Sequence, residues 1–559
     1  MRINQVKTII IFFGLISSLA SHSQYSRQDT LRGTVTPERS WWDVLRYDID
    51  ITPDYHTKTI TGNVVIGFKV TAPSKQMQID LQSPMLIDVV KLISGEGKNK
   101  KSYSIPGEAV RHEGNAWFLQ LPTLKVGTEH SLHITYHGKP REARSPPWDG
   151  GWVWAKDAKG RPWMTVACQG LGASVWYPCK DHQSDEPDLG ASLSISVHDT
   201  LVAVGNGRLV KKSSNGNKTS KWTWSVKNPI NNYNIIPYIG KYSNWTETFP
   251  GKSGKLDCSY WVMDYNLNRA KQHFGRDIKP MLECFEEWFG PYPFYQDSYK
   301  MVEAPHLGME HQSAIAYGNA YMDGYLGNDL SGTGWGNKFD FIIIHESGHE
   351  WFGNNITTKD IADMWVHEGF TNYSEVLYVE CRFGKEAAEE YCQGLRSGIE
   401  NELPIIGDYG VNNEGSGDMY AKGANLIHTI RHLIDNDSKF KSILKGLNQD
   451  FHLQTVSSRD IENYISRKSG TDLSKVFDQY LRDKRIPQLE YSIEGETLRF
   501  RWTNCIAGFN MPLKVYSGNR AFRINPTEKW QTMKWKGPVG ETSFQPDRNF
   551  YITSLNVIN

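Results

Sequence analysis

The chain is 559 residues long, of which 39% are apolar and 22% are charged, as is usual in soluble globular proteins. At about 100–200 residues per domain, this length predicts about three domains. Basic and acidic residues are equal in number, 62 and 62, so the formal net charge is zero. This balance gives no electrostatic footprint for an acidic membrane surface or for nucleic acid, and we expect no nucleic-acid partner.

The first residues are typical of a secretory signal peptide, which we predict over residues 1–23. A charged start precedes an apolar run over 8–19, and small residues follow at Ala20 and Ser23. The run is shorter than the roughly 20 residues that a membrane-spanning helix needs. We therefore expect cleavage after Ala20 or Ser23, no stable membrane insertion, and a protein exported to the periplasm or secreted.

Strand-like alternation dominates the segment 40–245. Apolar residues alternate with polar or smaller ones over 64–70, and again over 132–136 and 193–197, with glycine and proline between these runs. A period of two is the signature of strands with one buried face. We predict an N-terminal domain that is an antiparallel β saddle or sandwich.

Helical spacing replaces this alternation after about Asp257, and we predict a mainly helical domain over 246–484. Apolar side chains recur three or four positions apart over 281–288. Ser457 and Asp460 match a capping box at the start of a later helix.

A small β domain is predicted over 485–559. Pro487 ends the helical region, and alternation over 489–493 and 498–502, with the turn EGET between, indicates a hairpin.

The seven cysteines show no CxxC spacing, so neither a thiol metal site nor thioredoxin chemistry is predicted. An oxidising compartment permits disulfides. Cys381 and Cys392 are close enough in sequence to pair, which is a hypothesis about one disulfide.

The segment FIIIHESGHEWFG carries the clearest chemical signal. On a helix, His345 and His349 share one face and can bind one zinc ion, while Glu346 can reach a water at the metal as the general base. Glu368 lies 19 positions after His349 and supplies the third ligand that a catalytic zinc needs. Glu375 lies on the same helix face as Glu368, and either hydrogen-bonds a ligating histidine or is an ordinary solvated glutamate.

HESGHEWFGN followed by WVHEG resembles the gluzincin aminopeptidases of the aminopeptidase N and leukotriene hydrolase type. Three more segments agree, in the family's order: ACQGLGASVWYPCKD, HLGMEHQSAIAYG and DMYAKGANLIHTI. The resemblance covers roughly residues 40–485. It implies a multidomain α+β protein with a β saddle, a thermolysin-like catalytic domain and a short terminal β domain. It also implies a zinc metallo-aminopeptidase that acts on peptides with a free amino terminus.

The resemblance implies further roles by motif position. Glu310 would bind the free ammonium of the substrate, Tyr420 would donate a hydrogen bond to the oxyanion, and Gln169 would touch the substrate near its amino end. Gly308 and Met309 belong to the motif of Glu310, where strand pairing would align the peptide.

Two departures from the family pattern stand out. Leu307 and His311 occupy the places of a glycine and an asparagine in the exopeptidase motif; leucine restricts the backbone, and histidine is bulkier and titratable. The roughly 75 residues after Pro487 cannot form the large helical domain of many relatives, so we expect a more open cleft.

Other functions compete with this interpretation. An endopeptidase on the same zinc site is opposed by Glu310, which favours amine binding, and nothing in the sequence singles out an epoxide hydrolase. A catalytically dead peptide-binding protein is opposed by the presence of Glu346 and Tyr420. A third alternative is an adhesion protein, and only the C-terminal β domain is free of the catalytic motifs and leaves room for that role. Residue preference and oligomeric state are not predicted.

Overall fold

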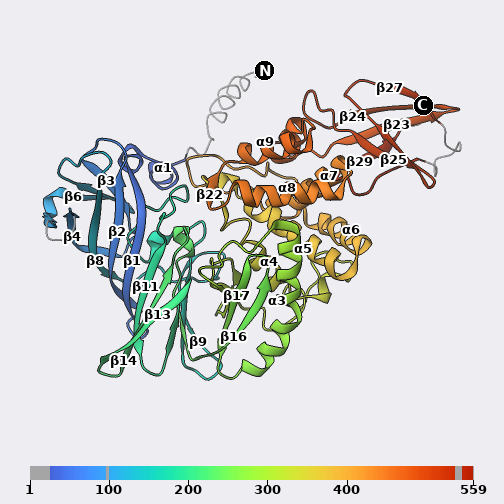
Figure 1. Ribbon diagram of the computed structural model, residues 1–559. Coiled ribbons are helices and arrows are strands. Elements are labelled where there is room, and N and C mark those ends of the chain that lie inside the picture. The colour runs from blue at the N-terminus through green and yellow to red at the C-terminus, as the bar shows by residue number, and fades with distance from the viewer. Residues whose placement is uncertain (1–24, 96–99, 536–543, 558–559) are drawn as a thin grey trace, which may run out of the picture.

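The computed structural model describes residues 25–95, 100–535 and 544–557. A β-rich N-terminal part, a mainly helical middle part and a small C-terminal β part follow one another along the chain (Figure 1). This confirms the multidomain α+β architecture expected from the sequence. The predicted signal peptide lies outside the described residues.

An eight-stranded sheet forms the centre of the N-terminal part. Adjacent strands are antiparallel, apart from β1 and β11, which run parallel with Tyr47 opposite Ala191. The expected alternation over 64–70 lies on β2, whose Val64, Ile66 and Phe68 are buried. The order of strands is β13 (Arg208–Gly216), β14 (Thr219–Val226), β11 (Ala191–His198), β1 (Trp42–Asp54), β2 (Thr59–Val70), β8 (Glu129–Gly138), β4 (Leu86–Ser94) and β5 (Lys101–Ile105).

Two smaller sheets complete this part. Strand β10 belongs to the four-stranded sheet and ends at Ala167, so the chain leaves that sheet just before Gln169. The four-stranded sheet has the order β12 (Val202–Val204), β15 (Tyr238–Gly240), β10 (Pro162–Ala167) and β9 (Gly151–Lys156), and the three-stranded sheet has the order β3 (Gln76–Asp80), β7 (Ala116–Gln120) and β6 (Val110–Glu113).

A five-stranded sheet connects the β-rich and helical parts. Its order is β16 (Tyr242–Gly251), β17 (Gly254–Met263), β18 (Tyr299–Glu303), β20 (Ile315–Tyr317) and β19 (Gly308–Met309). Strand β17 continues past Asp257, where helical spacing was expected, because Leu256, Cys258 and Tyr260 still alternate toward the core. The short β19 forms one edge of this sheet.

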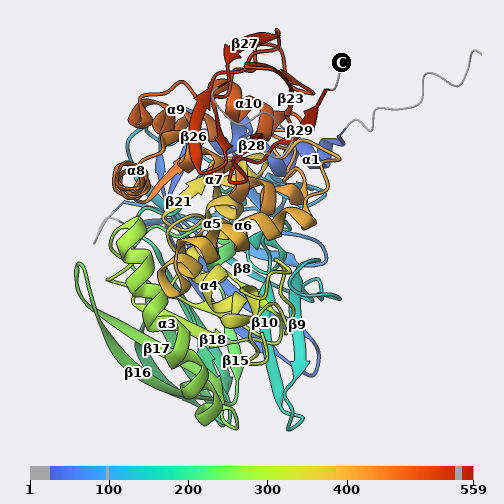
Figure 2. The same cartoon turned by 90° about the vertical axis from the view of Figure 1, so that its right-hand side faces the viewer.

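Helices dominate the middle part. Helix α3 packs against β16 and β17 on one side and against α8, α5 and α4 on the other, as Figure 2 also shows. Within the described residues, no helix is both long and apolar enough to cross a membrane. The helices are α1 (Arg27–Gly33) and α2 (Pro37–Ser40) near the start, then α3 (Leu267–Phe289), α4 (Phe341–Gly348), α5 (Trp365–Phe383), α6 (Lys385–Gly394), α7 (Ala421–Ile434), α8 (Asp437–Asp450), α9 (Ser458–Ser469) and α10 (Ser474–Arg482). The short parallel pair β21 (Ile356–Thr358) and β22 (Gln454–Val456) lies among them.

Several local signals in the sequence are confirmed. Ser457 and Asp460 form the predicted capping box at the start of α9. The predicted hairpin pairs Leu489 with Trp502. It opens a C-terminal part with one sheet in the order β27 (Gln531–Lys534), β24 (Thr497–Thr503), β23 (Gln488–Glu494) and β29 (Thr553–Asn556), and a second in the order β26 (Arg520–Ile524), β25 (Leu513–Ser517) and β28 (Phe544–Pro546).

The hypothesis that Cys381 pairs with Cys392 is wrong. Cys381 on α5 forms a disulfide with Cys284 on α3, with Cα atoms 6.1 Å apart, and Cys392 is a buried free thiol. Helices α3 and α5 pack together, so residues distant in sequence meet. Packing, which the spacing of cysteines does not reveal, decides the pairing.

We expect this disulfide to stabilise the fold, because it closes a loop across 97 residues of sequence. Replacing Cys284 and Cys381 together by alanine should lower the free energy of unfolding by roughly 2–5 kcal/mol, measured by urea denaturation under non-reducing conditions. Cys505→Ala, at a partly exposed free thiol, is the control and should change stability little. Equal stability of the double variant and the wild type would contradict the expectation.

Candidate metal centre

Three predicted ligands from two helices converge on one point. His345 lies in α4, His349 follows its last residue, and Glu368 lies in the first turn of α5. Their facing atoms are almost equally spaced: Glu368 Oε2 is 3.4 Å from His345 Nε2 and 3.3 Å from His349 Nε2, and the two nitrogens are 3.3 Å apart. Ligands at about 2.0–2.1 Å from a tetrahedral zinc are roughly 3.3 Å from one another. The triangle therefore fits one zinc ion.

The outer nitrogens of both histidines fix which nitrogen faces the metal. His345 Nδ1 lies 2.7 Å from Glu375 Oε1, and His349 Nδ1 lies 3.0 Å from Phe352 O. A carboxylate and a carbonyl can only accept, so each Nδ1 carries the proton and each Nε2 keeps its lone pair for a metal. Glu375 is fully buried and also accepts from Tyr391 OH at 2.6 Å. It is thus a partner of a ligating histidine and not a solvated glutamate.

Helix α4 has only eight residues, and a helix this short needs tertiary contacts to be stable. Its N-cap, the buried Asp340, accepts hydrogen bonds from Ile342 N and Ile343 N. The same carboxylate accepts from Tyr317 OH and from His273 Nε2, both at 2.7 Å. Asp340 was not predicted from the sequence, although an aspartate directly before an apolar helical run is a cap signal.

Two glycines allow helix α5, which carries the ligand Glu368, to pack closely against α7. A Cβ on Gly423 would lie 2.9 Å from Gly369 Cα, so the two backbones are in contact there. Gly369 follows the ligand Glu368, and Tyr420 is the N-cap of α7. This contact explains why the segments WVHEG and YAKG each need a glycine.

Tyr420 therefore stands beside the metal ligands. Its ring stacks on that of His345 with centroids 6.1 Å apart, and it remains 40% exposed. Partial burial raises the pKa of Tyr420, and the carboxylates of Glu368 and Glu310 raise it further, so the phenol keeps its proton. A protonated phenol facing the cleft can donate a hydrogen bond.

Glu310 and Gln169, which were predicted from separate segments, are in direct contact. Glu310 is 2% exposed, and its Oε1 accepts from Gln169 Nε2 at 2.5 Å and from Tyr233 OH at 2.7 Å. Burial raises the pKa of Glu310, and the nearby carboxylate of Glu368 raises it further. Tyr233 was missed because no local pattern marks it; only the fold brings it to Glu310.

Gly308 makes room for Glu346. A Cβ there would lie 2.6 Å from Glu346 Oε1 and 2.8 Å from Ile342 Cγ2. Strand β19 thus passes directly over the predicted general base. Burial raises the pKa of Glu346 to about 7, and a value near neutrality suits a general base. Met309 is 7% exposed, and its side chain packs in the N-terminal core.

The two unusual motif residues fit without strain. Leu307 is not among the described residues with positive φ, so a leucine is tolerated where the family has glycine. His311 is fully buried, and its Nδ1 lies 2.6 Å from Tyr238 OH. Burial lowers the pKa of His311 well below its usual value, so it stays neutral and adds no charge near Glu310.

Comparison with known proteins gives one family. The M1 N-terminal domain of peptidase family M1 matches residues 44–233, and the family M1 peptidase domain matches residues 276–480. Aminopeptidase M1 of Arabidopsis thaliana is 21% identical over 81% of the chain, and aminopeptidase N of Lactococcus lactis is 24% identical over 58%. A crystal structure of an M1 zinc metallopeptidase mutant from Deinococcus radiodurans, bound to a Tyr-Ser-Ala substrate, superposes with a TM-score of 0.64 at 19% identity.

The relatives differ in length. The match spans 51% of the Arabidopsis protein and 39% of the Lactococcus protein. With the Deinococcus structure it spans 79% of this chain and 95% of the other, so the fold likeness extends over nearly all of that protein.

We expect Glu375 to tune the affinity of the metal site through His345. Glu375→Gln should weaken zinc binding by roughly 10–100-fold, as loss of such partners does elsewhere. Competition with a chromogenic chelator measures this affinity. Arg382→Ala, an exposed change on the same helix, is the control. Wild-type zinc affinity in Glu375→Gln would show that the hydrogen bond does not support the ligand.

Proposed function

The chain belongs to peptidase family M1, and from that premise we propose that it is a zinc-dependent aminopeptidase. It hydrolyses the first peptide bond of peptides that have a free α-amino group. One observation carries the proposal: ligand atoms of Glu310, Glu346 and His349 lie within 4.8 Å of one another. An ammonium held by Glu310 therefore lies a single residue away from a carbonyl at the metal.

In the proposed mechanism each residue acts at a definite atom. A zinc ion held by His345, His349 and Glu368 would supply Lewis-acid chemistry at the scissile carbonyl and would lower the pKa of water to about 7. Glu346 takes the proton of the attacking water and passes it to the leaving amine. Tyr420 donates its hydroxyl hydrogen to the oxyanion. Glu310, supported by Gln169, holds the ammonium and so sets which bond is cut.

Strand β19 provides an edge that fits the peptide backbone. Gly308 and Met309 pair with β20 on one side, and β19 is the last strand of its sheet. An extended peptide can add to such an edge through backbone hydrogen bonds. Because Gly308 lies against Glu346, a peptide in this register would pass beside the general base.

We also propose that the protein is exported. The pattern of residues 1–23 supports this proposal, as does the Cys284–Cys381 disulfide, since disulfides persist mainly in oxidising compartments.

The proposed register predicts dependence on a free amino terminus. Peptides with a free α-amino group should lose one residue at a time, and N-acetylated versions should resist, because acetylation removes the charge that pairs with Glu310. Glu310→Gln should reduce kcat/KM by at least the loss of a desolvated charge pair, roughly 30–150-fold. Mass spectrometry of timed digests measures both. Glu283→Gln, on the surface of α3, is the control. Equal cleavage of free and acetylated peptides would refute the register.

The assigned chemistry predicts that rate and folding can be separated. Tyr420→Phe should lower kcat by about 10²–10³, as for one oxyanion donor, and Glu346→Gln should lower it further. Both should keep zinc and melting temperature, because neither residue is a ligand. Tyr103→Phe, at an exposed tyrosine of the N-terminal sheet, is the control. A Tyr420→Phe enzyme with normal kcat and a lower melting temperature would leave the tyrosine a packing role only.

A further inference from the structure

The segment 25–37, which we call the strap, includes α1 and is attached to the N-terminal part along its length. Gln78 Nε2 donates to Leu31 O at 3.2 Å, and the buried Arg39 donates to Thr34 O at 2.9 Å. These bonds hold backbone carbonyls, so the course of the strap is fixed and not merely its side chains. Figure 1 places α1 where the β-rich part meets the helical part.

The strap also reaches the loop 405–416 of the helical part, the segment that leads into Tyr420. Thr34 Oγ1 donates to Gly410 O at 2.6 Å. A Cβ on Gly33 would overlap Asn412 N, so the two backbones touch there as well. The strap therefore bridges the β-rich N-terminal part and the helical part of the protein.

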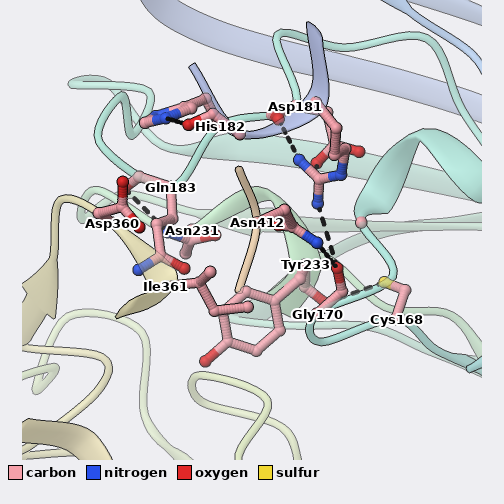
Figure 3. Close-up of a pocket in the computed structure, with 13 residues that line it drawn as sticks. Cys168, Gly170, Asp181, His182, Gln183, Asn231, Tyr233, Asp360, Ile361 and Asn412 are labelled. Atoms are coloured by element: carbon pink, nitrogen blue, oxygen red, sulfur yellow. Dashed lines mark hydrogen bonds and ion pairs between the residues drawn. The ribbon is translucent and has the colours of Figure 1, made fainter. Parts of the chain in front are cut away.

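Between these two attachments lies the turn that carries Gln169. Arg32 donates to Asp181 O, and its Nη2 lies 3.5 Å from Gly170 O. A Cβ on Gly172 would lie 2.5 Å from the same Nη2, so the guanidinium packs directly on the turn. Asn412 Nδ2 donates to the same oxygen, Gly170 O, at 3.0 Å, as Figure 3 shows.

The turn needs these external contacts. Gly170 and Gly172 have φ values of +71° and +101°, and glycine in this region has many other conformations available. Gln169 precedes Gly170, and its Nε2 is the donor to Glu310. A shift of the turn would therefore displace a hydrogen-bond donor of the amine-binding carboxylate.

The space beneath the strap is too small for a substrate side chain. A polar cavity of about 30 Å³, lined by Arg32, Asn412 and Tyr233 among others, lies there. This volume admits about two water molecules. Tyr233, one of the lining residues drawn in Figure 3, also donates to Glu310, so this tyrosine links the cavity to the amine-binding carboxylate.

We propose that Arg32 of the strap is a positioning residue, which holds the Gln169–Gly170 turn against Glu310. The inference rests on the proposed aminopeptidase function and identifies a residue that supports the amine-binding carboxylate from outside the site. Arg32 touches neither the substrate nor the metal, and it acts through Gln169.

The test compares two arginines of α1 in the full exported chain. Arg32→Ala should raise KM for a free-amine peptide about tenfold through loss of its hydrogen bonds, with kcat within about twofold and unchanged zinc content. Arg27→Ala removes an exposed ion pair with Glu113 and should leave KM unchanged. Arg32→Lys, which keeps the charge but not the fork of donors, should fall between wild type and Arg32→Ala.

Inhibition separates the amine end of the site from the metal. The inhibition constant of leucinamide, which carries a free amine, should rise in Arg32→Ala in proportion to KM. The inhibition constant of acetohydroxamate, a small metal ligand without an amine, should not change. If Arg32→Ala fails to fold, Thr34→Val, which removes only the bond to Gly410, should show the same pattern with a smaller effect.

The outcomes are distinct. Equal KM and leucinamide inhibition in wild type, Arg32→Ala and Thr34→Val would overturn the role of the strap. A parallel loss for leucinamide and acetohydroxamate would also overturn it, because the change would then reach the metal. A folded, zinc-loaded wild type that cleaves no free-amine peptide would instead refute the proposed function.

Discussion

The structure depends on the burial of three glutamates around one small space. Glu310, Glu346 and Glu368 are each less than 9% exposed. Carboxylates buried in this way are costly unless cations or donors compensate them. Glu368 Oε2 is buried and accepts no hydrogen bond among the described residues. A zinc ion bound by the two imidazoles would balance the charge of Glu368. A substrate ammonium would balance the charge of Glu310. The same group of charges thus suits a metal on one side and, in the proposed function, an amine on the other.

The surrounding fold keeps these charges at fixed distances. Asp340 anchors the short helix α4 at its start, and Glu375 holds His345 from behind. The contact of Gly369 with Gly423 joins the ligand helix to the segment of Tyr420. Each of these contacts holds a different element, so the site requires the packed domain and not a single motif.

Much of this was predictable where the signal is local. Spacing on one helix identifies His345 and His349, and alternation identifies the strands, because both follow from the geometry of a single element. Tyr233 and Arg32 act through contacts between elements far apart in sequence, and the pairing of Cys284 with Cys381 does so too. Strand β17 extends beyond Asp257, where we predicted a change to helical spacing, because the alternation of its side chains continues past that residue. Glu375 shows where sequence-based prediction ends: its place on the helix face was predictable, but the burial of its side chain was not.

The central claim is that one zinc ion sits between His345, His349 and Glu368. Anomalous scattering from crystals, measured on either side of the zinc absorption edge, tests it most directly. The account predicts one strong peak per chain at about 2.0–2.2 Å from His345 Nε2, His349 Nε2 and a Glu368 oxygen. A zinc-loaded, active crystal with no peak there, or with its peak on other residues, would contradict it.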